Sequence, residues 1–281
     1  MAVMSEGFLQ SADGTTLFYR EWLVDDACGA VQIVHGLGEH SGRYGELAGI
    51  FNAMGLSVRA LDHRGHGRSG GARGSIAERR DFLHDLQLVF DDFAKTQNTM
   101  PFLFGHSLGG LVAARFATGG FGAVRGLMLS SPALAIRLSG FQQVLLAVGS
   151  VLAPALAISS GLPQNGVSHD SEVVRGYRDD TFNHSKVAPR VVRFMLDAMD
   201  NSIADADHFA TPVLMQFAGD DLLVDPSGSE RFFTRLPDEN KTMHRYDDAY
   251  HEIFNEIAPL RQLVQQDLIA WMTGQLGSKS Q

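Results

Sequence analysis

The stretch PFLFGHSLGG, residues 101–110, joins an apolar run to a turn in which a serine stands between glycines. Its first part has the composition of a buried β-strand, and LGGLVAARFAT, residues 108–118, has that of a helix. Because a tight turn between them leaves little room for side chains at Gly105 and Gly109, it would lift the hydroxyl of Ser107 to a helix N-terminus, where negative charge is favoured. The pattern predicts a nucleophilic serine, and a glycine-rich turn with a serine helix cap is the alternative.

Outward from this turn, short apolar runs alternate with amphipathic segments along most of the chain. Residues 7–23 predict two strands around the turn signal Asp13-Gly14. Further strands are expected at 30–36, 56–63, 101–106, 124–132, 212–218 and 241–248, and helices at 43–55, 78–95, 108–118, 227–236 and 252–272. This alternation indicates an α/β fold with a mostly parallel eight-stranded sheet and helices on both faces, in which the first two strands are antiparallel.

The alternation is interrupted once. About 80 residues between Pro132 and Pro212 contain no obvious strand and are too many for a structureless loop. We expect a helical cap inserted over one end of the sheet. The predicted divisions are a core of residues 1–134, a cap of residues 135–208, and the rest of the core in residues 209–281.

The amino-acid composition excludes some classes of binding partner and favours one type of cellular compartment. The chain has 281 residues with 44% apolar residues, a net charge of −9 and a pI near 5.6, which argues against nucleic acid and against simple electrostatic docking onto anionic lipid. A single cysteine excludes an intramolecular disulfide and fits a reducing compartment. The first 25 residues lack the apolar core of a signal peptide, and the most apolar stretch, residues 144–158, is too short to span a bilayer.

A nucleophilic serine needs a base, and the base needs an orienting acid. In this architecture both follow late strands, the acid first. The segment GDDLLVD offers three candidate acids, Asp220, Asp221 and Asp225. In AYHEIFNE, His251 is the one histidine placed after the final predicted strand and beyond the acid, so we predict it as the base.

Acyl transfer also needs N–H donors that hold the carbonyl oxygen as it gains charge. One donor is expected from the residue after the nucleophile, Leu108. The other is expected from the loop HGLGEHSGRY, residues 35–44, in which Leu37 lies between two glycines. The alternative is that Gly36 and Gly38 simply form a turn.

Together HGLGEHSGRY, LDHRGHGRSGG, FGHSLGG, GDDLLVDPSGS and YHEIFNE resemble the monoacylglycerol lipase and lysophospholipase branch of the α/β-hydrolase superfamily. The resemblance covers nearly the whole chain and is weakest in the cap. It implies an α/β-hydrolase fold, selects Asp221 as the acid with Asp220 as the second choice, and places the oxyanion donors on Leu37 and Leu108. It also implies that Asp62, in the motif DHRGHGRS, has a structural role.

The first part of the predicted cap is rich in apolar residues and poor in charge. Part of it must pack on its own domain. The excess apolar surface would line an acyl tunnel and touch lipid, since each buried methylene contributes roughly 0.8 kcal/mol. The positions expected to bind substrate are Val144, Val148, Leu152 and Leu156.

The sequence therefore predicts a serine hydrolase that converts monoacylglycerol and water to glycerol and fatty acid. The alternatives are a lysophospholipase or a short- or medium-chain carboxylesterase, then an aminopeptidase or acyltransferase on the same fold, and last a binding protein. No metal or organic cofactor is expected, because the sequence has neither a Cys/His ligand cluster nor a dinucleotide fingerprint. The expected protein is cytoplasmic, with transient contact between its apolar cap and a membrane surface, and is a monomer or a homodimer.

Overall fold

A computed structural model of the chain describes residues 3–277. Eight strands form one sheet: β1 (Val3–Gln10), β2 (Thr16–Leu23), β3 (Gly29–Val34), β4 (Leu56–Leu61), β5 (Phe102–His106), β6 (Leu127–Ser130), β9 (Val213–Ala218) and β10 (Lys241–Tyr246). Their order across the sheet is β1-β2-β4-β3-β5-β6-β9-β10. The pairs β1–β2 and β2–β4 are antiparallel, and the five other pairs in the sheet are parallel. The mostly parallel eight-stranded sheet predicted from the sequence is confirmed.

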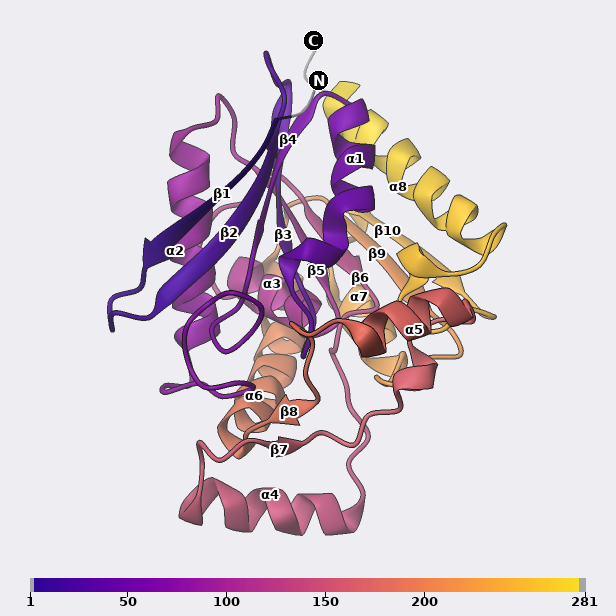
Figure 1. Ribbon diagram of the computed structural model, residues 1–281. Helices are drawn as coiled ribbons and strands as arrows, with labels where there is room; N and C mark the ends of the chain where they lie inside the picture. Colours follow the sequence, from indigo (N-terminus) through magenta and orange to yellow (C-terminus); the bar gives the residue numbers. More distant parts are fainter. Residues whose placement is uncertain (1–2, 278–281) are drawn as a thin grey trace.

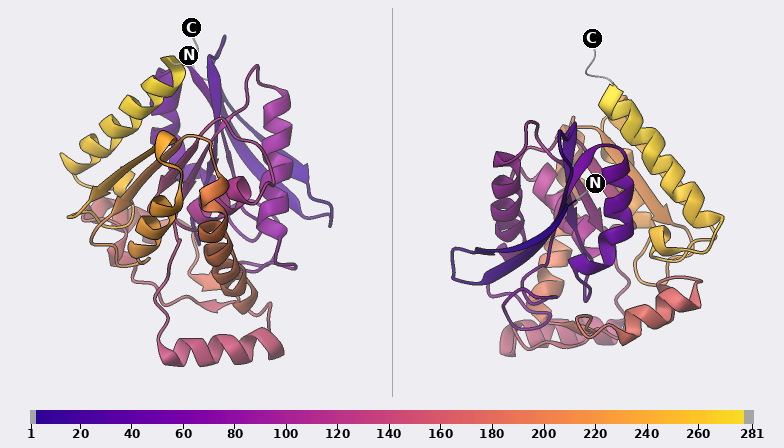
Figure 2. Two further views of the ribbon diagram at one scale, coloured as in Figure 1. Left: turned by 180° about the vertical axis from the view of Figure 1, so that it is seen from behind. Right: turned by 45° about the horizontal axis from the view of Figure 1, so that its top comes forward.

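Helices cover both faces of this sheet, as Figures 1 and 2 show. One face carries α1 (Gly45–Ala53) and α8 (Leu260–Gly277), whose apolar residues pack with those of the central strands. The other carries α2 (Asp81–Lys95), α3 (Leu108–Thr118), α6 (Pro189–Asp205) and α7 (Ser227–Arg235), which share a second and larger apolar cluster. The sheet is thus buried between two apolar layers, which explains why its central strands read as continuous apolar runs.

The segment between β6 and β9 contains α4 (Gly140–Leu152), β7 (Ile158–Ser159), α5 (Ser171–Asp179), β8 (Lys186–Val187) and α6. Strands β7 and β8 were not predicted from the sequence, because they are two residues each and pair only with one another. Figure 1 shows α4 apart from the sheet, at the end of the molecule toward which the parallel strands run. By contrast, α6 packs on the core through Val191, Phe194 and Met195. No helix among residues 3–277 has the length and hydropathy needed to cross a membrane.

The final helix begins at Leu260, eight residues later than predicted. A proline at position 259 disfavours helical geometry in the residue before it. In addition, the buried carboxylate of Glu256 accepts hydrogen bonds from the backbone N–H groups of Tyr250 and Ile257, which hold this segment in a loop.

The described residues also form five short 3₁₀ helices: η1 (Ser41–Tyr44), η2 (Gln164–Gly166), η3 (Ala206–His208), η4 (Asp238–Asn240) and η5 (Ile253–Asn255).

Candidate active site

Ser107 occupies the turn between β5 and α3 with φ 52° and ψ −120°. Residues with a side chain adopt this backbone conformation rarely. The neighbouring glycines allow it, because a Cβ on Gly109 would lie 2.2 Å from the carbonyl oxygen of Val34, and one on Gly105 would lie 2.4 Å from the carbonyl oxygen of Gly109. Strand β5, helix α3 and strand β3 therefore approach more closely than larger residues permit, and the turn has the geometry of a nucleophile elbow.

A buried histidine–carboxylate pair lies at the ends of the two last strands. His251 Nδ1 is 2.7 Å from Asp221 Oδ2. The other oxygen, Oδ1, accepts hydrogen bonds from the N–H groups of Leu223 at 2.8 Å and Val224 at 3.0 Å. His251 Nε2 is buried and has no hydrogen-bond partner among residues 3–277, and its ring lines the same cavity as Ser107. The arrangement fixes one ring nitrogen on the acid and leaves the other available to a proton donor in the cavity.

Electrostatics keep Asp221 ionised and make His251 more basic than an ordinary histidine. Burial by itself lowers the pKa of His251, but the charge of Asp221 and its hydrogen bond outweigh burial and raise the pKa above the usual histidine value. Burial likewise opposes ionisation of Asp221, whose pKa is nevertheless lowered by His251 and by the two backbone N–H groups. Asp221 therefore stays ionised and stabilises the protonated imidazole.

The two other candidate acids do not reach the histidine. Asp220 is exposed to solvent. Asp225 accepts a hydrogen bond from the N–H of Ser227 at the start of α7 and lies 3.5 Å from a guanidinium nitrogen of Arg137. Among the three aspartates, Asp221 alone contacts His251.

The two residues predicted to supply oxyanion donors lie on the same cavity as Ser107. Leu37 and Leu108 line the cavity together with Ser107. The loop after β3 comes so close that a Cβ on Gly36 would lie 3.1 Å from the Cβ of Ser107. Its position is held by Glu39, whose Oε1 accepts a hydrogen bond of 2.6 Å from the N–H of Gly36.

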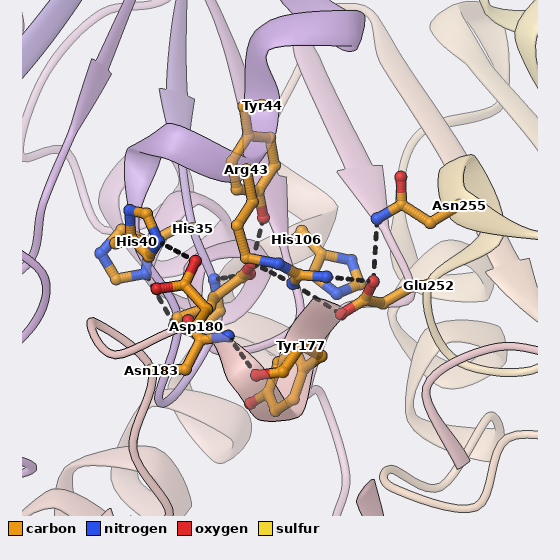
Figure 3. A network of polar contacts seen from close by, with 12 residues as sticks. His35, His40, Arg43, Tyr44, His106, Tyr177, Asp180, Asn183, Glu252 and Asn255 are labelled. Atoms are coloured by element: carbon orange, nitrogen blue, oxygen red, sulfur yellow. Dashed lines mark hydrogen bonds and ion pairs between the residues drawn. The ribbon is translucent and has the colours of Figure 1, made fainter. Parts of the chain in front are cut away.

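Glu39 belongs to a buried network of charged side chains, which Figure 3 shows. This network was not predicted from the sequence. The guanidinium of Arg43 is 2.7 Å from Glu39 Oε2 and makes two contacts of 2.7 and 2.8 Å with Glu252. The Tyr44 hydroxyl donates to Glu39 Oε1 at 2.7 Å. Although burial raises the pKa of Glu39, Arg43 outweighs it, and the pKa falls to about 2. Glu39 and Arg43 are four residues apart in HGLGEHSGRY, a spacing from which their ion pair could have been predicted. The contact between Arg43 and Glu252 could not, because only the fold brings these two residues together.

His106 and Asp62 have supporting positions. His106 hydrogen-bonds to Ser130 and lies beside His251, with ring centres 4.8 Å apart. Burial and the neighbouring His251 lower the pKa of His106 to about 4, so it is neutral near pH 7. Asp62 accepts hydrogen bonds of 2.7 Å from the N–H groups of Ser41 and Arg68, which ties two loops together and agrees with a structural role.

A cavity of about 160 Å³ opens from Ser107 under the segment that follows β6. Its charged lining residues are Glu39, Glu252 and Arg137. Most of the remaining wall is apolar and includes Ile136, Leu138, Leu162, Val167, Val187, Val192 and Met195. The four cap positions predicted to bind substrate do not line this cavity. Their exposed fractions are 63% for Val144, 51% for Val148, 78% for Leu152 and 64% for Leu156.

Comparisons with known proteins agree with this geometry. The family described as serine aminopeptidase, S33, matches residues 25–258. A monoacylglycerol lipase from Mycolicibacterium smegmatis is 34% identical over 278 residues, which cover 97% of this chain and 98% of the relative. Phospholipase YtpA from Bacillus subtilis is 31% identical, with coverages of 84% and 92%. A crystal structure of the Paleococcus ferrophilus monoacylglycerol lipase superposes with a TM-score of 0.80 at 30% identity, over 98% of this chain and 99% of that one.

Proposed function

The chain belongs to the serine aminopeptidase S33 family of α/β-hydrolases, and from this premise we propose that it hydrolyses carboxylic esters of single-chain lipids, with monoacylglycerol as the substrate. One observation carries the proposal. Ser107 at the elbow and His251 line one predominantly apolar cavity; Asp221 holds Nδ1 of this histidine, and its Nε2 has no hydrogen-bond partner in the part of the chain that the structure describes. Relatives of nearly the same length carry the name monoacylglycerol lipase.

In the proposed mechanism, Ser107 Oγ attacks the ester carbonyl while His251 Nε2 takes the serine proton. The carbonyl oxygen becomes negatively charged and is held by the N–H groups of Leu37 and Leu108. His251 then donates its proton to the leaving glycerol oxygen, which gives an acyl-serine. A water molecule activated by His251 attacks this ester, frees the fatty acid and returns the proton to Ser107. Asp221 remains ionised throughout and stabilises the imidazolium of both steps.

The family description includes aminopeptidases, but the cavity favours an uncharged ester. A peptide substrate would bring a free ammonium group, which needs a carboxylate that is not already neutralised. The carboxylates that line the cavity are Glu39 and Glu252, and Arg43 contacts both. An ammonium group entering here would compete with a buried guanidinium, whereas an acyl chain gains from the apolar wall.

Arg137 supports lysophospholipase activity as a second candidate. Arg137 lines the cavity, and its side chain is 62% exposed while its guanidinium forms an ion pair of 3.5 Å with Asp225. A phosphodiester headgroup in the cavity would compete with Asp225 for this charge. Phospholipase YtpA is 31% identical to this chain over 239 aligned residues.

We also propose that α4 meets the lipid surface that holds the substrate. Along this helix only Leu146 is buried, and its exposed residues include Phe141 at 78% and Val151 at 79%. No charged residue occurs from position 138 to 168. The positions Val144, Val148, Leu152 and Leu156 would therefore contact lipid from outside the cavity rather than line it.

The test is fatty-acid release from monooleoylglycerol, lysophosphatidylcholine and p-nitrophenyl butyrate, measured side by side with Ser107→Ala as the control. We expect the highest kcat/KM on monooleoylglycerol and none on any ester with the variant. A preference for lysophosphatidylcholine that is lost in Arg137→Gln would replace the proposal by the second candidate. Turnover of the butyrate ester alone would reduce the protein to a short-chain esterase.

A further inference from the structure

A second depression lies outside the catalytic cavity, where the C-terminal end of α4 meets α6 and the loop before α2. It has a volume of about 550 Å³. Four arginines line it, Arg79, Arg80, Arg190 and Arg193, together with Ser150 of α4. The only carboxylate among its described lining residues is Glu78. In a chain of net charge −9, this gathers positive charge at one place.

Three of the four guanidinium groups are not neutralised. Arg79 forms an ion pair of 2.8 Å with Asp197, but Arg80, Arg190 and Arg193 form none within residues 3–277. Arg190 donates to the backbone carbonyl of Ile76, and Arg193 Nε donates to Ser150 Oγ at 3.1 Å. These contacts fix the two side chains without cancelling their charge, so the depression is suited to an anion.

The exposed apolar residues beside the depression indicate the class of anion that it binds. Ser150 is followed directly by Val151 and Leu152, whose exposed fractions are 79% and 78%. The uncharged outer face of α4 therefore borders the arginines, and Figure 1 shows this helix at the extremity of the molecule. Guanidinium groups bind phosphate oxygens well, and an apolar helix with a basic border is typical of surfaces that lie in the lipid headgroup region.

We propose that this depression binds the phosphate of an anionic phospholipid in a bilayer while the outer face of α4 rests among the acyl chains. The arginine site would orient the protein on the membrane with the α4 end inward. The inference concerns binding to anionic lipid and does not depend on the hydrolytic activity proposed above. The net charge of −9 is a sum over the whole chain. A local cluster of arginines can therefore still attract an anionic surface.

The experiment is sedimentation with vesicles of phosphatidylcholine alone and of phosphatidylcholine with one quarter phosphatidylglycerol, at low salt. We expect binding to the anionic vesicles to be at least about 25-fold stronger, because Arg80 and Arg193 should each contribute about fivefold. Each positive charge removed near an anionic surface costs about fivefold in partitioning, so Arg80→Gln/Arg193→Gln should lose about 25-fold on anionic vesicles. Its binding to phosphatidylcholine alone should be unchanged.

Lys95→Gln/Arg231→Gln is the matched control. It removes the same charge from the far end of α2 and from α7, and it should keep the preference for anionic vesicles. An equal loss in this control would overturn the proposal, because it would show a general effect of charge. Equal binding of the wild type to both vesicles would also overturn it. So would micromolar binding of inorganic phosphate without a vesicle preference, which would identify a site for soluble phosphate. Melting temperature and p-nitrophenyl butyrate turnover check that each variant is folded.

Discussion

At the scale of the residue, a buried carboxylate sets the protonation of the proposed catalytic base. Asp221 is 4% exposed and His251 is 2% exposed, so neither exchanges its partner for water. Asp221 raises the pKa of His251 above the usual value against the effect of burial. Because only the neutral imidazole accepts the serine proton, activity should rise as the pH rises through this pKa.

Asp221→Asn should lower kcat about 10⁴-fold, the scale of the same change in other serine hydrolase triads. Without the carboxylate, the protonated imidazole loses its main stabilisation, so the pKa of His251 falls and the acidic limb of the pH–rate profile moves to lower pH. The measurements are kcat and kcat/KM on p-nitrophenyl butyrate from pH 4 to 9. Asp220→Asn and Asp225→Asn are the controls and should stay within about twofold of the wild type. A larger loss in Asp225→Asn than in Asp221→Asn would assign the acid differently.

Glu39 is expected to act through the oxyanion loop. Glu39→Ala removes the acceptor for the N–H of Gly36 and should lower kcat by about 10- to 100-fold with little change in KM, since a displaced oxyanion donor weakens only the transition state. Tyr44→Phe removes one hydrogen bond to the same carboxylate but keeps the loop contact, so its effect should be smaller. Rates are normalised to active sites titrated with a phosphonate. An unchanged kcat per titrated site in Glu39→Ala would reduce Glu39 to a purely structural residue.

At the scale of the element, the strand–turn–helix unit around Ser107 depends on backbone contact. Gly109→Ala would place a methyl group 2.2 Å from the carbonyl oxygen of Val34, and rigid backbone cannot yield as a side chain does. We expect a loss of at least about 1–3 kcal/mol in the free energy of unfolding, together with loss of activity. Gly49→Ala is the control, because its new Cβ meets no atom within 4 Å among residues 3–277 apart from the local backbone of its own helix. Helix α1 should therefore gain about 0.5–1 kcal/mol. Denaturant unfolding measures both, and a neutral Gly109→Ala would contradict the close packing of β3 and α3.

The sequence is informative where a local pattern determines the structure. The strands alternate with helices because buried parallel strands must be apolar, and the elbow is visible because glycines and serine are neighbours in the chain. Two kinds of feature could not be predicted from the sequence. The pairing of Arg43 with Glu252 joins residues that only the fold brings together. The direction of the α4 side chains depends on how the helix sits on the core, so its apolar residues gave no indication that they point away from the cavity.

At the scale of the whole molecule, the apolar outer face of α4 and the catalytic cavity lie at the same end of the sheet. We expect Val151→Asp to weaken binding to phosphatidylcholine vesicles by about tenfold, because it places a charge where a methyl group would enter lipid. Hydrolysis of monooleoylglycerol held in those vesicles should fall in parallel. Turnover of the soluble butyrate ester should not change, since Val151 does not line the cavity. A parallel loss on both substrates would show that α4 supports the cavity rather than the membrane contact.

The most direct test of the proposed nucleophile is covalent trapping with a long-chain alkyl phosphonate ester, followed by mass spectrometry of the intact protein and its peptides. We predict one adduct, located on Ser107, with loss of hydrolysis in proportion to labelling and no adduct in Ser107→Ala. An adduct on another residue, or hydrolysis that persists in Ser107→Ala, would contradict the proposed site and its mechanism.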